Sequence, residues 1–291
     1  MLSLYAANAS SSFFQWVWSL VTTYWPMFLK GAGVTLLIAI TATITGSVIG
    51  LLIGVVRTIP ITPKSSRFKR AVMKVVNFIL TAYIEVFRGT PMIVQAMVIF
   101  YGAAMGGVYL PTLLAGYLIV SVNTGAYMAE IVRGGILSID KGQFEAAHSI
   151  GMSHTQTMRS IILPQVIRNI LPATGNEFVI NIKDTSVLNV ISVSELFFQS
   201  KTIAANNYRY FEVFFVTCVL YFIMTFTITR ILRLIENITL GTAAVGYRTE
   251  SMHGAGSPQA QRIMISRQGN LAAKKELAKV IAKVDESKDR K

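Results

Sequence analysis

Cysteine and histidine are scarce in this chain of 291 residues, which contains one cysteine, Cys218, and three histidines. One cysteine cannot form an intrachain disulfide or a thiolate metal cluster. His148 and His154 are six residues apart and do not share a helix face, so we predict no metal site and no cofactor. The chain also lacks the glycine loop GxxxxGK[ST] of Walker-type ATPases, so we expect no ATP hydrolysis by this chain.

Charged residues are also few, at 14% of the chain, whereas 53% of its residues are hydrophobic. Soluble globular proteins usually have about a quarter charged residues, so this composition indicates a polytopic membrane protein. The net charge of +13 is concentrated in a few loops and the tail. It does not lie on a domain with aromatic stacking positions, so we expect no nucleic-acid partner.

Five stretches are long enough to cross a hydrocarbon core of about 30 Å, which takes roughly 20 apolar helical residues. They show no strand-like alternation and cover residues 31–56, 76–104, 112–136, 171–195 and 211–234. The sequence therefore predicts an all-α polytopic membrane protein with five transmembrane helices. In the first span, Gly46, Gly50 and Gly54 recur every four residues, a spacing that permits close helix packing.

The topology follows from the loop between the first two spans. This loop contains no acidic residue and six basic ones, Arg57, Lys64, Arg67, Lys69, Arg70 and Lys74. The positive-inside rule places such a loop in the cytoplasm. Alternation of the spans then predicts an N-terminus outside the cell and a cytoplasmic C-terminus.

The two ends of the chain differ from the membrane domain, which we expect to cover residues 31–238. Residues 1–30 are predicted to form an interfacial segment with a helix over 13–29, interrupted at Trp25 and Pro26. Its aromatic belt consists of Trp16, Trp18, Tyr24 and Trp25. Residues 239–291 form a basic tail with apolar residues at helical spacing over 271–284. This tail is either a solvated, partly ordered extension or a docking or lipid-surface helix.

The long cytoplasmic loop, residues 138–165, has the pattern of two short helices around a glycine. Asp140 is expected to cap the first helix, Gly151 to end it in a left-handed conformation, and Ser153 to begin the second. Pro164 is expected to end the second helix before the fourth span. The remaining positions of interest are Glu145, Ala146, Ala147, Ile161 and Leu163. Physical reasoning leaves two readings, a partner-binding loop or an ordinary exposed amphipathic loop.

This loop resembles the EAA loop of ABC-importer permeases. Its residues Glu145-Ala146-Ala147, three further residues, Gly151, nine further residues, and Ile161-x-Leu163-Pro164 match every specified position of that pattern. The segments 83–91, 126–136 and 183–186 resemble the polar amino-acid uptake branch of the family, and the likeness extends over about residues 31–238.

The resemblance implies a type I ABC-importer permease of a bacterial inner membrane. Two such subunits, identical or related, would pair around a pathway, and each would insert its coupling loop into an ATPase subunit. An extracytoplasmic binding protein would deliver an amino acid, and the partner subunit would hydrolyse ATP. A membrane-embedded enzyme is a poor alternative, because no histidine lies within a predicted span. A self-sufficient ion-coupled transporter would normally show repeated halves.

Ionisable residues within the predicted spans are costly and need a partner or a function. Glu177, Asn181 and Asp184 are spaced four and three residues apart in the fourth span, so they share one helix stripe. We expect this stripe to face a substrate pathway, where carboxylates would bind the ammonium group of an amino acid. The resemblance points the same way. In the alternative reading, Lys183 and Asn176 neutralise the carboxylates within a structural network.

Two further charged pairs have a three-residue spacing. Glu85 and Arg88 could form an ion pair in the second span, followed by Gly89 and Pro91, which weaken the helix and form either a hinge or a packed kink. Glu130 and Arg133 at the inner end of the third span are expected to form a structural ion pair or an anchor beside the loop.

Overall fold

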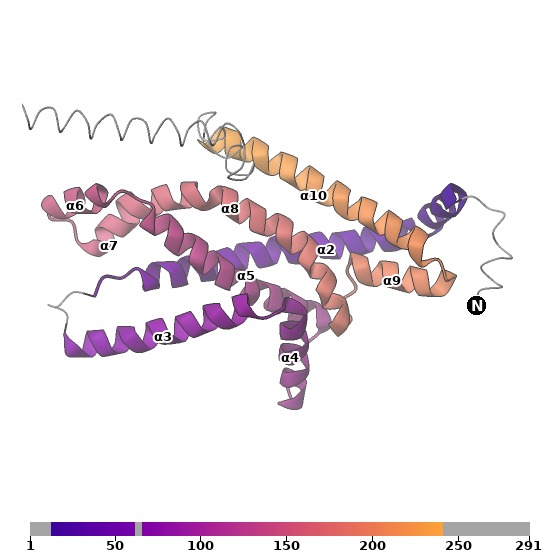
Figure 1. Cartoon of the computed structure of the whole chain (residues 1–291), viewed down its shortest axis with the longest axis horizontal. Helices are drawn as coiled ribbons and strands as arrows, with labels where there is room; N and C mark the ends of the chain where they lie inside the picture. Colours follow the sequence, from indigo (N-terminus) through magenta and orange to yellow (C-terminus); the bar gives the residue numbers. More distant parts are fainter. Residues whose placement is uncertain (1–12, 62–65, 241–291) are drawn as a thin grey trace, which may run out of the picture. The chain divides into compact units, whose positions relative to one another are not determined.

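The computed structural model describes residues 13–61 and 66–240, and in these residues it is entirely helical. The predicted all-α fold is therefore confirmed (Figure 1). In chain order, the elements are α2 (Phe13–Arg57), α3 (Arg67–Gly89), α4 (Met92–Met105), α5 (Thr112–Leu137), α6 (Lys141–Ser149), α7 (His154–Thr157), the π-helical turn η1 (Met158–Ile162), α8 (Leu163–Asp184), the 3₁₀ helix η2 (Thr185–Ile191), α9 (Leu196–Asn207) and α10 (Tyr210–Leu240). The predicted helix over 271–284 lies outside the described residues.

Three of the described helices, α2, α5 and α10, are long and apolar enough to cross a membrane. The helix α4 is apolar but shorter. The other two predicted spans correspond to α3 with α4 and to α8, and both α3 and α8 contain several charged residues. The number of five spans stays a prediction.

The centre of the fold is the close packing of α2 against α5. A Cβ atom at Gly50 would lie 2.3 Å from Met128 Cβ, and one at Gly54 would lie 2.6 Å from a Val132 methyl. Neither position has room for a side chain, so the two helix backbones approach closely. The predicted packing role of the four-residue glycine spacing is confirmed.

The helix α2 corrects the prediction of a separate N-terminal helix. It continues without a break through Trp25 and Pro26. Leu20 and Phe28 from its first half are buried in a cluster with residues of α9 and α10. Proline removes one backbone hydrogen bond, but packing against neighbouring helices preserves the long helix. The location of residues 13–29 at the membrane interface stays a prediction.

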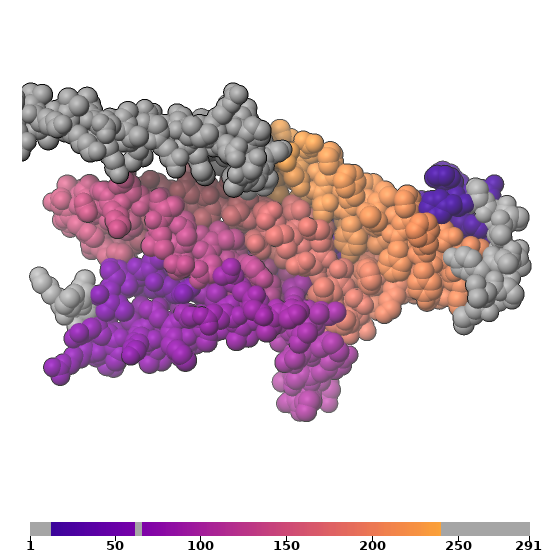
Figure 2. All heavy atoms as spheres, in the orientation of Figure 1, coloured from indigo at the N-terminus to yellow at the C-terminus, as the bar shows by residue number. Residues whose placement is uncertain are grey.

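The predicted second span, 76–104, is two helices rather than one. The helix α3 ends at Gly89, and α4 begins at Met92 after Pro91, which has an extended backbone. Figures 1 and 2 show α4 standing out from the long helices. Proline disfavours helix at the residue before it, which explains the break at Thr90. The sequence analysis correctly identified Gly89 and Pro91 as residues that weaken the helix. It nevertheless predicted one continuous span across them.

The fourth span also begins earlier than predicted. Pro164 lies in the first turn of α8, but α7, η1 and α8 follow one another without a break, so the proline does not end a helix there. The chain accommodates this proline beside the π-helical turn η1, where the Leu163 N–H donates to the Met158 carbonyl five residues earlier. The helix ends at Asp184, and the 3₁₀ helix η2 continues the chain.

Candidate functional site

The loop of residues 138–165 begins with a capped helix, α6. The Asp140 side chain accepts a hydrogen bond from the Gly142 N–H at 2.6 Å and is the N-cap of α6. This bond satisfies one of the free N–H groups in the first helical turn. The prediction of Asp140 as a capping residue is therefore confirmed.

The turn after α6 also has its predicted geometry. Gly151 has a φ angle of +82°, the left-handed conformation that glycine adopts most easily. Ser153 then caps α7 in a reciprocal arrangement, in which its hydroxyl accepts from the Gln156 N–H while the Gln156 side chain accepts from the Ser153 N–H. Two caps and one glycine thus fix the path of the loop.

One face of the loop packs on the C-terminal ends of α2 and α5. Met158 and Ile162 of η1 are buried in a cluster with Val132 and Ile136 of α5, and Phe144 of α6 packs against the same cluster. Burial of this apolar surface holds the loop to the membrane helices. Ile161 and Leu163, which belong to the EAA-like pattern, are partly buried at its edge. In this structure, both side chains therefore contribute to packing.

The opposite face of α6 is exposed. Glu145 and Ala146 are on the surface, whereas Ala147 is only 2% exposed and faces the interior. Ile150, which ends α6, is 78% exposed. Ile150 therefore leaves a large apolar side chain on this face of the loop. The sequence analysis gave Ile150 no role.

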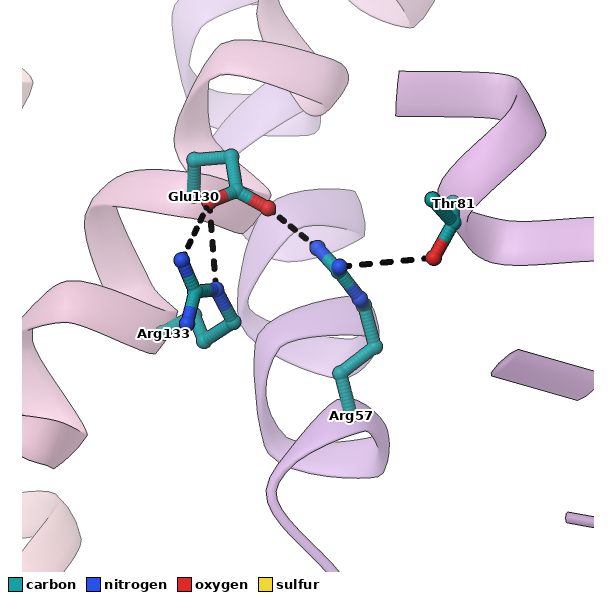
Figure 3. A network of polar contacts seen from close by, with 4 residues as sticks. All are labelled: Arg57, Thr81, Glu130 and Arg133. Atoms are coloured by element: carbon teal, nitrogen blue, oxygen red, sulfur yellow. Dashed lines mark hydrogen bonds and ion pairs between the residues drawn. The ribbon is translucent and has the colours of Figure 1, made fainter. Parts of the chain in front are cut away.

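A charged network joins three helices on the same side of the fold (Figure 3). The Glu130 carboxylate accepts hydrogen bonds from Arg57 at the end of α2 and from Arg133, whose Nη2 lies 2.9 Å from Oε2. Arg57 also donates to Thr81 of α3. The predicted Glu130–Arg133 ion pair is confirmed. The sequence analysis counted Arg57 only as a basic loop residue, because its partner is 73 positions away.

The polar stripe of α8 divides into two parts. Asn181 is buried, donates to the Thr43 hydroxyl of α2 at 2.8 Å, and accepts from the Thr124 hydroxyl of α5 at 3.1 Å. Its amide therefore joins three helices. This bonding makes Asn181 a structural residue in the described fold.

The two carboxylates of the stripe have a different environment. Glu177 is 9% exposed, and Asp184 is half-buried at the end of α8. Glu177 interacts electrostatically with Asp184 and with Arg88 of α3, while Lys183 acts on Asp184. Two segments distant in sequence, α3 and α8, thus bring Arg88 into electrostatic range of Glu177, while Asp184 has Lys183 and Glu177 as charged neighbours.

The predicted Glu85–Arg88 ion pair is wrong for this conformation, since the ion pairs found in residues 13–61 and 66–240 do not include it. Arg88 instead lies over the Tyr127 ring of α5, with its guanidinium carbon 5.4 Å from the ring centroid. Cation–π contact with Tyr127 and the charge of Glu177 draw it toward α5 and α8.

Two amides stabilise the break between α3 and α4. Gln95 Nε2 donates to the Phe87 carbonyl and to both oxygens of Thr90, each at 2.9 Å. Asn123 of α5 donates to Gln95 Oε1 and to the Phe87 carbonyl. These bonds satisfy a carbonyl that Pro91 leaves without its helical donor. The described break is therefore a packed kink, and the hinge at Gly89 and Pro91 stays a prediction.

Comparison with known proteins decides the family. A family model described as the inner membrane component of binding-protein-dependent transport systems matches residues 66–237, more than half of the chain. The chain belongs to this family. It is a permease subunit of an inner-membrane transport system and not an enzyme, as the sequence predicted. A second model, the C-terminal region of 4-hydroxyphenylacetate 3-hydroxylase, matches only residues 224–283, most of which lie outside the described part.

Individual relatives agree with this assignment. The glutamine transport system permease GlnP of Escherichia coli K12 is 38% identical over 224 residues, which cover 76% of this permease and 97% of GlnP. The L-cystine permease TcyB of Bacillus subtilis is 33% identical over 75% of this chain and 89% of its own. A crystal structure of an amino acid ABC transporter with histidines matches with a TM-score of 0.67 and 37% identity, over 78% of this chain and 99% of that chain.

Proposed function

We propose that the chain is the membrane subunit of an ATP-driven importer for a polar amino acid. It would pair with a second permease subunit, receive its substrate from an extracytoplasmic binding protein, and be driven by ATPase subunits that bind the exposed face of α6. The relatives that transport glutamine and cystine support an amino-acid substrate. The single observation that carries the coupling role is the division of the loop into a packed underside and an exposed face.

The packing of the loop supports a force-transmitting role. Its underside shares one apolar cluster with the inner ends of α2 and α5, while Glu145, Ala146 and Ile150 are exposed on the other side. A partner that moves α6 would therefore displace packed helices and not a loose segment. Coupling between two sites requires such an element, because both ligands must bias the same equilibrium.

The charges around α8 support recognition of a zwitterion. A free amino acid presents an ammonium group and a carboxylate, and Glu177 with Asp184 offers acidic partners for the first. Arg88 offers a basic partner for the second, since it lies in electrostatic range of Glu177. Asn181 would position this stripe through its bonds to α2 and α5 and would not bind the substrate. The opposing Lys183 charge beside Asp184 favours Glu177 as the principal ammonium ligand.

The orientation of the subunit belongs to the same proposal. The basic residues of 57–74 place that segment and α6 in the cytoplasm, where an ATPase has access to nucleotide. The N-terminus is then outside and the C-terminus inside. Cysteine labelling from each side of sealed vesicles would measure this orientation directly.

The coupling role is tested by Gly151→Val in the reconstituted complex of permease, ATPase and binding protein. A valine at φ +82° is strained, so α6 should be displaced and amino-acid uptake should fall at least about 100-fold. The matched control is Gly134→Ala, because Gly134 is helical and a Cβ there meets no atom within 4 Å. Uptake by the control should equal that of the wild type.

Two measurements make the result decisive. Membrane levels of Gly151→Val should stay close to those of the control and its melting temperature should fall only modestly, because the backbone strain is confined to one residue, while ATPase binding or substrate-stimulated ATP hydrolysis is lost. Normal coupled uptake by a stably inserted Gly151→Val permease would refute the coupling role of this loop.

A further inference from the structure

A groove between α8 and α10 is lined by basic as well as apolar side chains. Three of its lining residues are basic, namely Lys183, Arg230 and Arg233, and none is acidic. The other lining residues are Val179, Phe222, Thr225, Phe226 and Thr229. The groove thus combines cationic groups with aromatic rings.

The groove is bounded at its inner end by a helix contact. A Cβ atom at Gly175 of α8 would lie 3.3 Å from a methyl of Leu232 on α10, so the two helices touch there. At the outer end, Val213 and Val216 of α10 pack against α9 and α2. Between these contacts, the side chains of Arg230 and Phe226 are exposed.

The two arginines are the unmatched charges of the groove. Lys183 has the neighbouring Asp184 carboxylate in electrostatic range. Over the described ranges 13–61 and 66–240, the ion pairs do not include Arg230 or Arg233. Arg230 lies over the Phe226 ring, 4.7 Å from its centroid, a contact that orients its guanidinium without neutralising its charge. Cations along a membrane helix require a counter-charge or access to the interface.

On the orientation proposed above, on which this inference rests, we propose that this groove binds an anionic phospholipid of the cytoplasmic leaflet. Arg230 and Arg233 bind the phosphate, and an acyl chain packs along Phe222 and Phe226. Arginine forms bidentate hydrogen bonds with phosphate oxygens, and basic pockets between membrane helices on the cytoplasmic side are suited to anionic headgroups. A second copy of this chain is a poorer occupant, because it has 27 basic and only 14 acidic residues.

The test is native mass spectrometry of the full-length permease with its ATPase, purified in detergent and incubated with equal amounts of phosphatidylglycerol and phosphatidylcholine. The wild type should retain phosphatidylglycerol preferentially. Arg230→Gln/Arg233→Gln should retain about 30-fold less, because each arginine near an anionic surface contributes about fivefold to binding. The matched control, Arg67→Gln/Arg70→Gln, removes the same charge from exposed positions on α3 and should retain the wild-type amount.

Several outcomes would overturn the proposal. They are equal retention of both lipids by the wild type, unchanged retention by Arg230→Gln/Arg233→Gln, or an equal loss in the α3 control. The wild-type measurement decides the matter even if the double variant does not fold. A disulfide between two copies of Thr229→Cys, made on a Cys218→Ser background, would show a protein-covered groove and would also overturn it. Retention restored by Arg230→Lys/Arg233→Lys would support a charge-dependent site.

Discussion

The loop of residues 138–165 and the polar stripe of α8 both contain neighbouring residues with different environments. In the loop, Ala146 is exposed and the adjacent Ala147 is buried, so one alanine faces solvent while the other packs. In the stripe, Asn181 is hydrogen-bonded to two helices, whereas Glu177 one turn earlier meets other charges. Membership of a motif therefore does not give its residues one role. Burial and bonding separate the residues that hold a site from those that act in it.

The largest effect on stability is expected from a substitution of the buried alanine in the loop. Ala147→Leu adds three carbon atoms at a position that is 2% exposed. Overpacking of this kind costs about 3 kcal/mol, so the apparent melting temperature of the purified complex should fall by several degrees. Circular dichroism or a thermal-shift assay in detergent would measure the change.

The matched variant is Ala146→Leu, which adds the same atoms to the exposed face. Its melting temperature should equal that of the wild type, while its affinity for the ATPase subunit should fall. If both leucine variants lose the same stability, the two alanines do not differ in environment and the comparison fails.

A somewhat smaller effect should follow Asn181→Leu in the stripe. The buried Thr124 hydroxyl would lose its acceptor, and Thr43 would lose its donor. A buried polar group left without a partner costs about 2 kcal/mol, which a thermal unfolding assay detects. In contrast, Glu177→Gln keeps the shape of the side chain, so uptake should fall while stability changes little. The reverse pattern would assign the structural role to Glu177.

Much of the loop could be predicted because its helix caps and turn depend on residues that are close in sequence. Asp140, Gly151 and Ser153 act on backbone groups within three residues of themselves, so sequence spacing alone indicates their capping roles. Pro164 was expected to end a helix, whereas the helical path from α7 to α8 continues through it. A proline normally removes a helical hydrogen bond, and no spacing rule indicates the π-helical turn η1 that precedes it here.

Contacts between distant segments could not be predicted in this way. Arg57 contacts Glu130, and Asn181 contacts Thr43, across 73 and 138 positions. No spacing rule relates such pairs, because helix packing determines which faces meet. For the same reason, Arg88 was assigned to Glu85 three residues away, while the fold turns it toward Tyr127.

The smallest effect on stability is expected from lowering the pH, which tests a histidine in the loop. Partial burial lowers the pKa of His154 below its ordinary value of 6.5, and the nearby charges of His148 and Lys69 lower it further. The unfolded chain therefore binds a proton at a higher pH than the folded loop does. Stability is full above the ordinary pKa and falls as the pH drops below it toward the lowered value.

The direction of this pKa shift can be tested by measuring the melting temperature at two pH values. The melting temperature of the wild type should decrease slightly more than that of His154→Gln between about pH 7.5 and about pH 5.5, the range in which histidines titrate. His148→Gln removes one of the opposing charges, so it should reduce this dependence without abolishing it. Identical pH profiles for the wild type and His154→Gln would show that protonation of His154 does not change the stability of the loop.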